Sequence, residues 1–133
     1  MKKAFITGIN GQDGSYLTEH LLKMNVEVGG LIRRSSVAEN QTYRINSHLN
    51  DIKTYYGDLI DPRSISKALN DFKPDVIFNL AAQSHVRLSF EMPAFTGQVN
   101  AIGALNVFNI VKEEFPDIRV YQASSSEMFG SAV

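Results

Sequence analysis

The sequence contains no cysteine, and it has no excess of charge of either sign. Without cysteine the chain can form no disulfide, thiol nucleophile or zinc–thiolate site. Thirteen basic and fourteen acidic residues leave a formal net charge of −1, which removes the case for binding nucleic acid or an anionic membrane through bulk charge. No apolar run approaches the ~18–20 residues of a membrane span. A glycine turn follows the first few residues, too early for the apolar core of a signal peptide, so we expect a cytoplasmic protein.

What the chain does have is the composition of a globular domain. Its 133 residues are 44% hydrophobic and 20% charged, and one domain typically takes ~100–200 residues. No internal repeat, low-complexity tract or linker divides it. We therefore treat residues 1–133 as one unit with a single fold.

Short β-rich runs alternate with helical patterns along the chain. Strands are expected at residues 4–7, 26–32, 52–56, 76–80 and 119–123. The run at 76–80 is apolar throughout, as in a parallel strand that is buried on both faces. Strand–helix alternation with long crossovers predicts a doubly wound α/β fold of Rossmann type, with five parallel strands in the order 3-2-1-4-5. A sixth strand is missing, so we expect this sheet to be incomplete.

Helical patterns fill the gaps between these strands. Asp61 is placed to cap a helix that starts at Pro62. A second long helix is expected to open at Pro93, and residues 35–50 are expected to form a polar loop with one helical turn. The apolar face of the first helix is set by Ile65, Ala68, Leu69 and Phe72, and that of the second by Ala104, Val107, Phe108 and Val111.

The first strand is followed by the spacing G-x-x-G-x-x-G over residues 8–14. Glycines let the backbone turn sharply and approach a ligand closely, and the N–H groups of the following helix attract a diphosphate. The common dinucleotide spacing is G-x-G-x-x-G, so this loop differs by one residue. A tight turn that binds nothing is the alternative, and its position between a strand and a helix argues against it.

The second strand ends in Arg33-Arg34 rather than in the acidic residue that would bind a ribose hydroxyl. Arginine instead pairs with a 2′-phosphate. This favours NADP over NAD as the cofactor. The alternative is a pair of arginines that only face solvent.

Several longer motifs resemble the extended short-chain dehydrogenase/reductase family, and in particular its nucleotide-sugar dehydratases. The similarity follows the whole chain in order. The segments that carry it are Thr7–Leu17, Ile32–Ser36, Tyr56–Leu59, Asn79–Val86, Ser89–Pro93 and Gln122–Gly130. The resemblance implies NADP-dependent removal of water from GDP-mannose to give GDP-4-keto-6-deoxymannose. It also implies a homo-oligomer, a dimer or tetramer, to which the loop at residues 35–50 contributes. A solvated monomeric loop is the alternative.

The resemblance also implies where the cofactor lies. The diphosphate would be bound by the loop from Gly8 to Asp13, the adenosine phosphate by Arg33, and the adenine and nicotinamide by segments after the third and fourth strands. Ser84 would contact the sugar, whereas His85 is expected to be structural. The implied cofactor residues are Gly8, Asn10, Gly11, Gln12, Asp13, Gly14, Arg33, Asp58, Leu59, Leu80, Ala81, Ala82 and Gln83. Alternatively, Asp58 is an ordinary turn residue and Leu80 to Ala82 belong to the core.

The segment after the fifth strand holds the candidate catalytic residues. The reaction oxidises the sugar at C4, removes the C5 proton, expels the C6 hydroxyl as water and reduces C6. Glu127 could take the C5 proton and protonate the leaving oxygen. Ser125 could donate a hydrogen bond to the C4 oxygen, where the family usually has threonine. No metal is expected. A polar loop and a surface carboxylate are the alternatives.

The family's Tyr-x-x-x-Lys pair is absent from these 133 residues, because no tyrosine has lysine four residues later. The sugar-nucleotide domain is absent as well. We therefore expect an N-terminal portion of an enzyme, inactive alone. Two other functions stay open: a nucleotide-sugar epimerase or reductase, and a non-catalytic dinucleotide-binding module.

Overall fold

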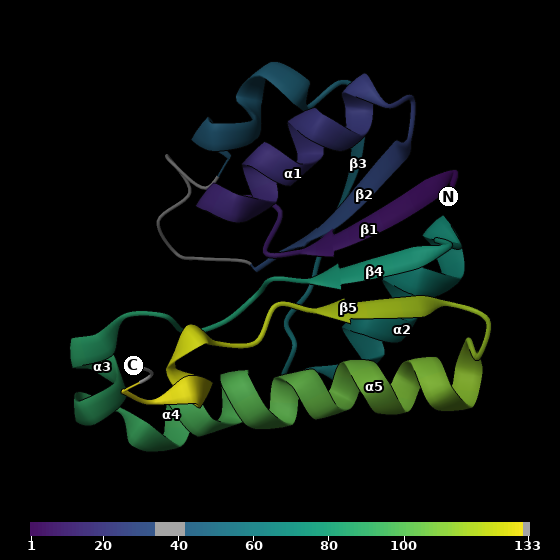
Figure 1. The fold of residues 1–133 in the computed structure, drawn as a ribbon. Helices are drawn as coiled ribbons and strands as arrows, with labels where there is room; N and C mark the ends of the chain where they lie inside the picture. Colours follow the sequence, from purple (N-terminus) through teal and green to yellow (C-terminus); the bar gives the residue numbers. More distant parts are fainter. Residues whose placement is uncertain (34–41, 132–133) are drawn as a thin grey trace.

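The computed structural model describes residues 1–33 and 42–131, apart from the side chains of Ser126 and Glu127. Its centre is one parallel sheet of five strands in the order β3-β2-β1-β4-β5 (Figure 1). The strands are β1 (Lys3–Thr7), β2 (Glu27–Ile32), β3 (Ile52–Tyr56), β4 (Val76–Asn79) and β5 (Arg119–Gln122). All four strand pairings are parallel. The predicted Rossmann-type fold and strand order are confirmed.

Helices cover both faces of this sheet. The helix α1 (Gln12–Lys23) lies on one face beside the short 3₁₀ helix η2 (Tyr43–His48), and α2 (Pro62–Phe72) and α5 (Gly103–Glu114) lie on the other (Figure 1). The short helices α3 (Val86–Glu91) and α4 (Pro93–Gly97) lie beyond the carboxyl ends of β4 and β5. A π-helical segment, η3 (Gln98–Ile102), joins α4 to α5, and the 3₁₀ helix η4 (Ser126–Phe129) follows β5.

The two faces bury separate apolar clusters, as a sheet sandwiched between helices requires. Phe5 of β1 packs with Phe72 and Val107 on the face of α2 and α5. Its neighbour Ile6 points the other way, into the cluster that includes Leu21 of α1. Each of these side chains is at most 3% exposed. The continuous apolar character of the central strands is therefore explained by burial on both sides.

Three local features differ from the sequence-based expectation. The stretch after Pro93 is divided by the π-helical segment, and α3 precedes it. The buried face of α5 is formed by Val107, Ile110 and Val111 with Gly103, whereas Phe108 is 41% exposed. Asp61 occupies the N-cap position of α2, but its side chain makes no capping hydrogen bond. The buried side of α5 is the one that contacts α2 and packs at Gly103 against Leu59.

Apolar side chains are exposed beside β5, which forms one edge of the described sheet. Tyr121 is 55% exposed, and Met128 and Phe129 of η4 are more exposed still. Uncovered apolar surface thus lies beside this edge strand. Within the described residues, no helix has the length and apolar character to cross a membrane.

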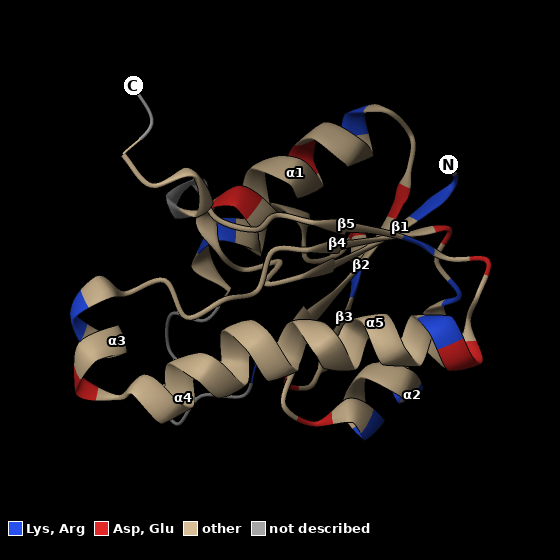
Figure 2. Cartoon of the chain, turned by 60° about the horizontal axis from the view of Figure 1, so that its bottom comes forward, with Lys and Arg blue, Asp and Glu red and all other residues tan. Residues whose placement is uncertain are grey.

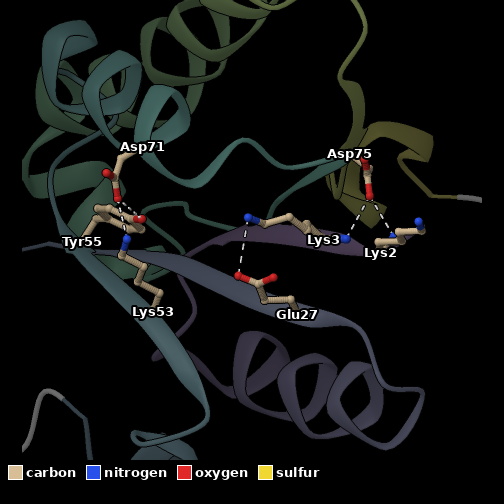
Figure 3. Close-up of polar contacts among 7 residues, drawn as sticks. All are labelled: Lys2, Lys3, Glu27, Lys53, Tyr55, Asp71 and Asp75. Carbon is tan, nitrogen blue, oxygen red and sulfur yellow. Dashed lines mark hydrogen bonds and ion pairs between the residues drawn. The ribbon is translucent and has the colours of Figure 1, made fainter.

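Polar and charged side chains on and beside the strands form hydrogen bonds between neighbouring elements (Figure 3). The Asp75 carboxylate, just before β4, accepts hydrogen bonds from the backbone N–H groups of Lys2 and Lys3 at 2.7 and 2.9 Å. On β3, Lys53 and Tyr55 both bond to Asp71 of α2 at 2.6 Å. The Lys53 ammonium and the Tyr55 hydroxyl together lower the pKa of the Asp71 carboxyl.

Asp75 should make the stability of the protein dependent on pH in acid. Hydrogen bonds from the Lys2 and Lys3 backbone lower the pKa of its carboxyl below the ordinary value of 3.8. The unfolded chain therefore binds this proton more readily, and the contribution of Asp75 is present above pH 3.8 and lost as the pH falls through the folded-state pKa. Replacing Asp75 with asparagine should lower the free energy of unfolding at neutral pH, and the difference from wild type should shrink below pH 3.8. Urea titrations across this range measure it.

Asp51→Asn is the matched control, since it removes the same charge from an exposed turn. Its difference from wild type should stay small throughout, because isolated surface charges contribute little. If the loss of unfolding free energy in Asp75→Asn did not change with pH, the lowered pKa of the Asp75 carboxyl would be contradicted.

Candidate functional site

A pocket of about 700 Å³ opens at the carboxyl edge of the sheet. Its walls come from the segments that follow β1, β2, β3, β4 and β5, together with side chains of α4 and the π-helical segment. In open parallel α/β sheets, ligands bind outside the carboxyl ends of the strands where the strand order reverses. Here that reversal lies between β1 and β4, which are adjacent in the sheet.

The glycine loop forms the floor of this pocket beside α1. Gly8 has a φ of +70°, which side chains other than glycine rarely adopt. A Cβ on Gly8 would lie 3.0 Å from the Ala81 Cα, so the loop after β1 approaches the segment after β4 closely. Gly11 donates its N–H to the Gly8 carbonyl at 2.9 Å and stands at the N-cap of α1 without a side-chain cap. The first-turn N–H groups of α1 are thus presented to an anion.

Beneath the loop, a buried polar network joins the ends of three strands. The Thr7 hydroxyl donates to the Asn79 side chain and accepts a hydrogen bond from the Ala81 N–H. Asn79 in turn donates to the Gln122 side chain at 2.7 Å. Thr7 and Asn79 are each 1% exposed, and buried polar groups of this kind are strongly constrained by their partners. The network fixes how β1, β4 and β5 end at the pocket.

The structure gathers the predicted cofactor-binding residues around this single pocket. Every one of them lines it: Gly8, Asn10, Gly11, Gln12, Asp13, Gly14, Arg33, Asp58, Leu59, Leu80, Ala81, Ala82 and Gln83, with Ser84 beside them. Sequence reasoning did not predict the remaining lining residues as ligands: Leu31, Gly57, His85, Leu88, Phe95, Val99, Ala123 and Ser124. Phe95 and Val99 lie in the helical stretch, where no motif marked them.

The residues after β3 combine a local turn with the pocket wall. The Asp58 carboxylate accepts a hydrogen bond from the Ile60 N–H at 3.2 Å, and the Asp58 N–H donates to the Ser64 hydroxyl at 3.0 Å. Asp58 is therefore a turn residue as well as a lining residue. Leu59 is only 3% exposed and belongs to the core on the α2 side. The interpretation of Asp58 as a turn residue is thus compatible with its position in the pocket wall.

Arg33 lines the pocket directly after β2, the strand next to β3. Its guanidinium is 5.9 Å from the centre of the Phe95 ring of α4, within reach of a cation–π interaction. The two residues thus approach each other from different elements at the same pocket. Its neighbour Arg34 and the first part of the predicted subunit-contact loop lie outside the described residues.

The 3₁₀ helix η2 lies in the described part of the loop at residues 35–50 that is predicted to contact another subunit. Its Ile45 is fully buried in the core on the α1 side, which anchors the segment to the sheet. The Arg44 guanidinium lies 4.8 Å from the centre of the Tyr43 ring, and Tyr43 is 56% exposed.

His85 serves as the N-cap of α3. Its Nδ1 accepts a hydrogen bond from the Leu88 N–H, at a long distance of 3.4 Å. This agrees with the expectation that His85 is structural, although its side chain also reaches the pocket wall. Ser84, the predicted sugar contact, is exposed at the same wall.

The segment after β5 brings the candidate catalytic residues near the pocket. Ser124 lines it and has a φ of +56°, a strained conformation for a residue other than glycine. Ser125 follows without lining the pocket, and its carbonyl accepts from the Met128 N–H in η4. The backbone of Glu127 lies in η4, and its side chain is outside the described part of the structure. Among the described residues, no group of His, Asp or Glu could hold a metal ion.

Fold and pocket position together place the chain in the Rossmann class of α/β proteins. Comparison with known proteins narrows this class. The family model for GDP-mannose 4,6-dehydratase matches residues 5–133, and the chain belongs to this family. It is 49% identical to GDP-mannose 4,6 dehydratase 1 of Arabidopsis thaliana over 98% of this chain, and 42% identical to the human GDP-mannose 4,6 dehydratase over 96% of it.

Solved structures agree on the fold. The UDP-glucose 4-epimerase of Thermus thermophilus, solved as a complex with NAD, superposes on 89% of this chain with a TM-score of 0.75 and 25% identity. That match covers 36% of the epimerase chain. The present chain likewise spans 39% of the length of the Arabidopsis relative and 36% of the human one.

Proposed function

We propose that this chain is the cofactor-binding part of an enzyme that converts GDP-mannose to GDP-4-keto-6-deoxymannose and water, with NADP as cofactor. One observation carries the proposal. In a member of this family, every residue predicted to bind the cofactor lines one pocket at the carboxyl edge of the sheet. The curated relatives bear the name of this reaction. A homo-oligomer is part of the proposal.

The pocket residues suit an extended, negatively charged ligand. The N–H groups at the start of α1 would bind a diphosphate, because the glycine at the N-cap leaves them without a side-chain cap. Asp58 and Leu59 form the wall for an adenine ring. Leu80 to Ser84 form the wall for the nicotinamide. The solved epimerase in complex with NAD supports a nicotinamide dinucleotide as the ligand class.

The proposed reaction is balanced without an external oxidant. A bound nicotinamide dinucleotide would accept a hydride from the sugar and return it within one turnover. Ser125 would donate a hydrogen bond to the C4 oxygen. Glu127 would remove the C5 proton and deliver it to the C6 hydroxyl, which leaves as water. The tyrosine of the family's Tyr-x-x-x-Lys pair, which does not occur in these 133 residues, would take the C4 hydroxyl proton, and a proton would be returned to C5 when the hydride adds to C6.

Arg33 supports NADP as the particular cofactor. Its guanidinium lies at the pocket wall after β2, where the ribose of an adenosine would meet the protein. A guanidinium forms strong paired hydrogen bonds with a phosphate, whereas it gains less from a ribose hydroxyl. The Phe95 ring of α4 lies 5.9 Å from the guanidinium at this wall.

The full-length protein that contains these 133 residues tests the proposal directly, because the 133 residues alone are expected to be inactive. Incubated with GDP-mannose and NADP, it should form a product that mass spectrometry finds lighter by one water. Calorimetry should show NADP binding more tightly than NAD, by about 10-fold or more. An epimerised sugar of unchanged mass would favour the epimerase alternative, and cofactor binding without turnover would favour the non-catalytic module. Equal affinity for NADP and NAD would contradict the role of Arg33.

A further inference from the structure

One continuous helical rod, residues 93–114, runs past two walls of the pocket. It consists of α4, the π-helical segment η3 and α5, and the backbone stays helical at both junctions, Gly97 and Gly103. No Lys, Arg, Asp or Glu occurs between Pro93 and Val111, and Figure 2 shows this stretch free of charge. Its polar contacts with the pocket segments are therefore made by neutral side chains.

Asn100 of the π-helical segment binds the backbone of a pocket residue at two points. Its Oδ1 accepts a hydrogen bond from the Gln83 N–H at 2.7 Å, and its Nδ2 donates to the Gln83 carbonyl at 2.9 Å. Only a carboxamide offers a donor and an acceptor side by side for this pairing. Two bonds to one residue fix its orientation as well as its position.

The side chain of Gln83 extends this attachment. Its Nε2 donates to the Thr96 hydroxyl on α4 at 3.0 Å and to the His85 carbonyl at 3.2 Å, and its Oε1 accepts from the His85 N–H. Both polar atoms of the Gln83 side-chain amide thus form hydrogen bonds with other residues of the protein. Gln83, predicted as a cofactor ligand, is in this structure a link between the nicotinamide wall and the rod.

The adenine wall is attached to the same rod. Asn106 of α5 donates a hydrogen bond to the Leu59 carbonyl at 2.7 Å. One turn earlier, a Cβ on Gly103 would lie 2.8 Å from the Leu59 Cβ, so the helix backbone packs directly against this residue. Asn100 lies within the π-helical segment, and Asn106 lies beyond it in α5. Such segments change the direction of side chains and are frequent at functional sites.

We propose that Asn100 and Asn106 are positioning residues, each for one half of the cofactor pocket. Asn100 sets the place of the nicotinamide wall through Gln83, and Asn106 sets the place of the adenine wall through Leu59. This inference rests on the proposed function, since it assumes a dinucleotide in the pocket. It assigns two positions along one helical rod to the two ends of one ligand.

Binding of two probes by the intact protein separates these roles. NADP spans both walls, whereas ADP-ribose 2′-phosphate lacks the nicotinamide. Asn100→Ala should weaken NADP binding by about 10-fold and change ADP-ribose 2′-phosphate binding by less than about 2-fold. Asn106→Ala should weaken the binding of both by about 10-fold. Asn109→Ala, which alters an exposed residue of the same helix, is the matched control and should leave both affinities unchanged.

Hydrogen exchange in the ligand-free protein gives a second readout. The Gln83 amide should exchange about 10-fold faster in Asn100→Ala, and Asn100→Asp, which keeps the acceptor, should restore its protection. Failure of the unaltered protein to bind either probe would overturn the proposed function and this inference with it. Normal binding by both variants, or equal weakening of both probes by Asn100→Ala, would overturn this inference alone.

Discussion

Replacing Gly14 with alanine should both destabilise the protein and remove most of its cofactor affinity. A Cβ at this position would lie 2.3 Å from the Gly8 carbonyl oxygen and 2.8 Å from the Ile9 Cα. These are backbone atoms, so no side-chain rotation relieves the clash and either the loop or α1 must move. We expect a loss of about 3 kcal/mol in the free energy of unfolding. Because the displaced N–H groups are those that we propose to bind the diphosphate, NADP affinity should fall by about 100-fold.

Gly97→Ala is the matched control for this change. It makes the same substitution in a glycine of α4 that has nothing within 4 Å of the new Cβ and ordinary helical backbone angles. Alanine is the better helix former, so this variant should gain up to about 1 kcal/mol. Urea unfolding and calorimetry compare the two variants. If Gly14→Ala behaves as Gly97→Ala does, the close packing of the loop is unimportant.

Much of the pocket could be predicted from the sequence because its residues lie in continuous segments. The loop at residues 8–14 lies between a strand and a helix, and such a turn has few possible conformations. Asp58 and Leu59 follow β3, and residues 80–84 follow directly after the buried strand β4. In a parallel sheet the segments that follow the strands all lie at one edge. Predicting the strands therefore also predicted where these segments lie. Their agreement with the structure follows from topology.

The parts that could not be predicted depend on contacts between distant residues. Nothing in the sequence around Asn100 shows that its amide pairs with the Gln83 backbone, seventeen residues earlier. The same holds for Asn106 and Leu59. Phe108 was predicted to lie on the buried face of α5, but it is exposed. Helical spacing gives the width of an apolar face but leaves the position of its centre uncertain by one residue. Packing against α2 decides which side of α5 is buried.

The buried network below the pocket also depends on a contact between distant residues, since Thr7 and Asn79 are 72 residues apart. Replacing Asn79 with leucine removes the acceptor of the Thr7 hydroxyl and the donor to Gln122. Buried groups left without partners cost about 1–3 kcal/mol each, so we expect a loss of about 3 kcal/mol in the free energy of unfolding. The exposed Asn70 of α2 is the control, and Asn70→Leu should change stability by less than about 0.5 kcal/mol.

A double-mutant cycle with Thr7→Val shows whether these groups act as one unit. Thr7→Val alone leaves the Ala81 N–H and the Asn79 side chain without their partner, at a cost of about 2 kcal/mol. Once Asn79 is leucine, the Thr7 hydroxyl has already lost its acceptor, so its removal should cost less. The double variant should therefore be about 1–2 kcal/mol more stable than the sum of the single losses predicts. Additive losses would mean that Thr7 and Asn79 act independently, and that the ends of β1 and β4 are held at the pocket by their backbone pairing alone.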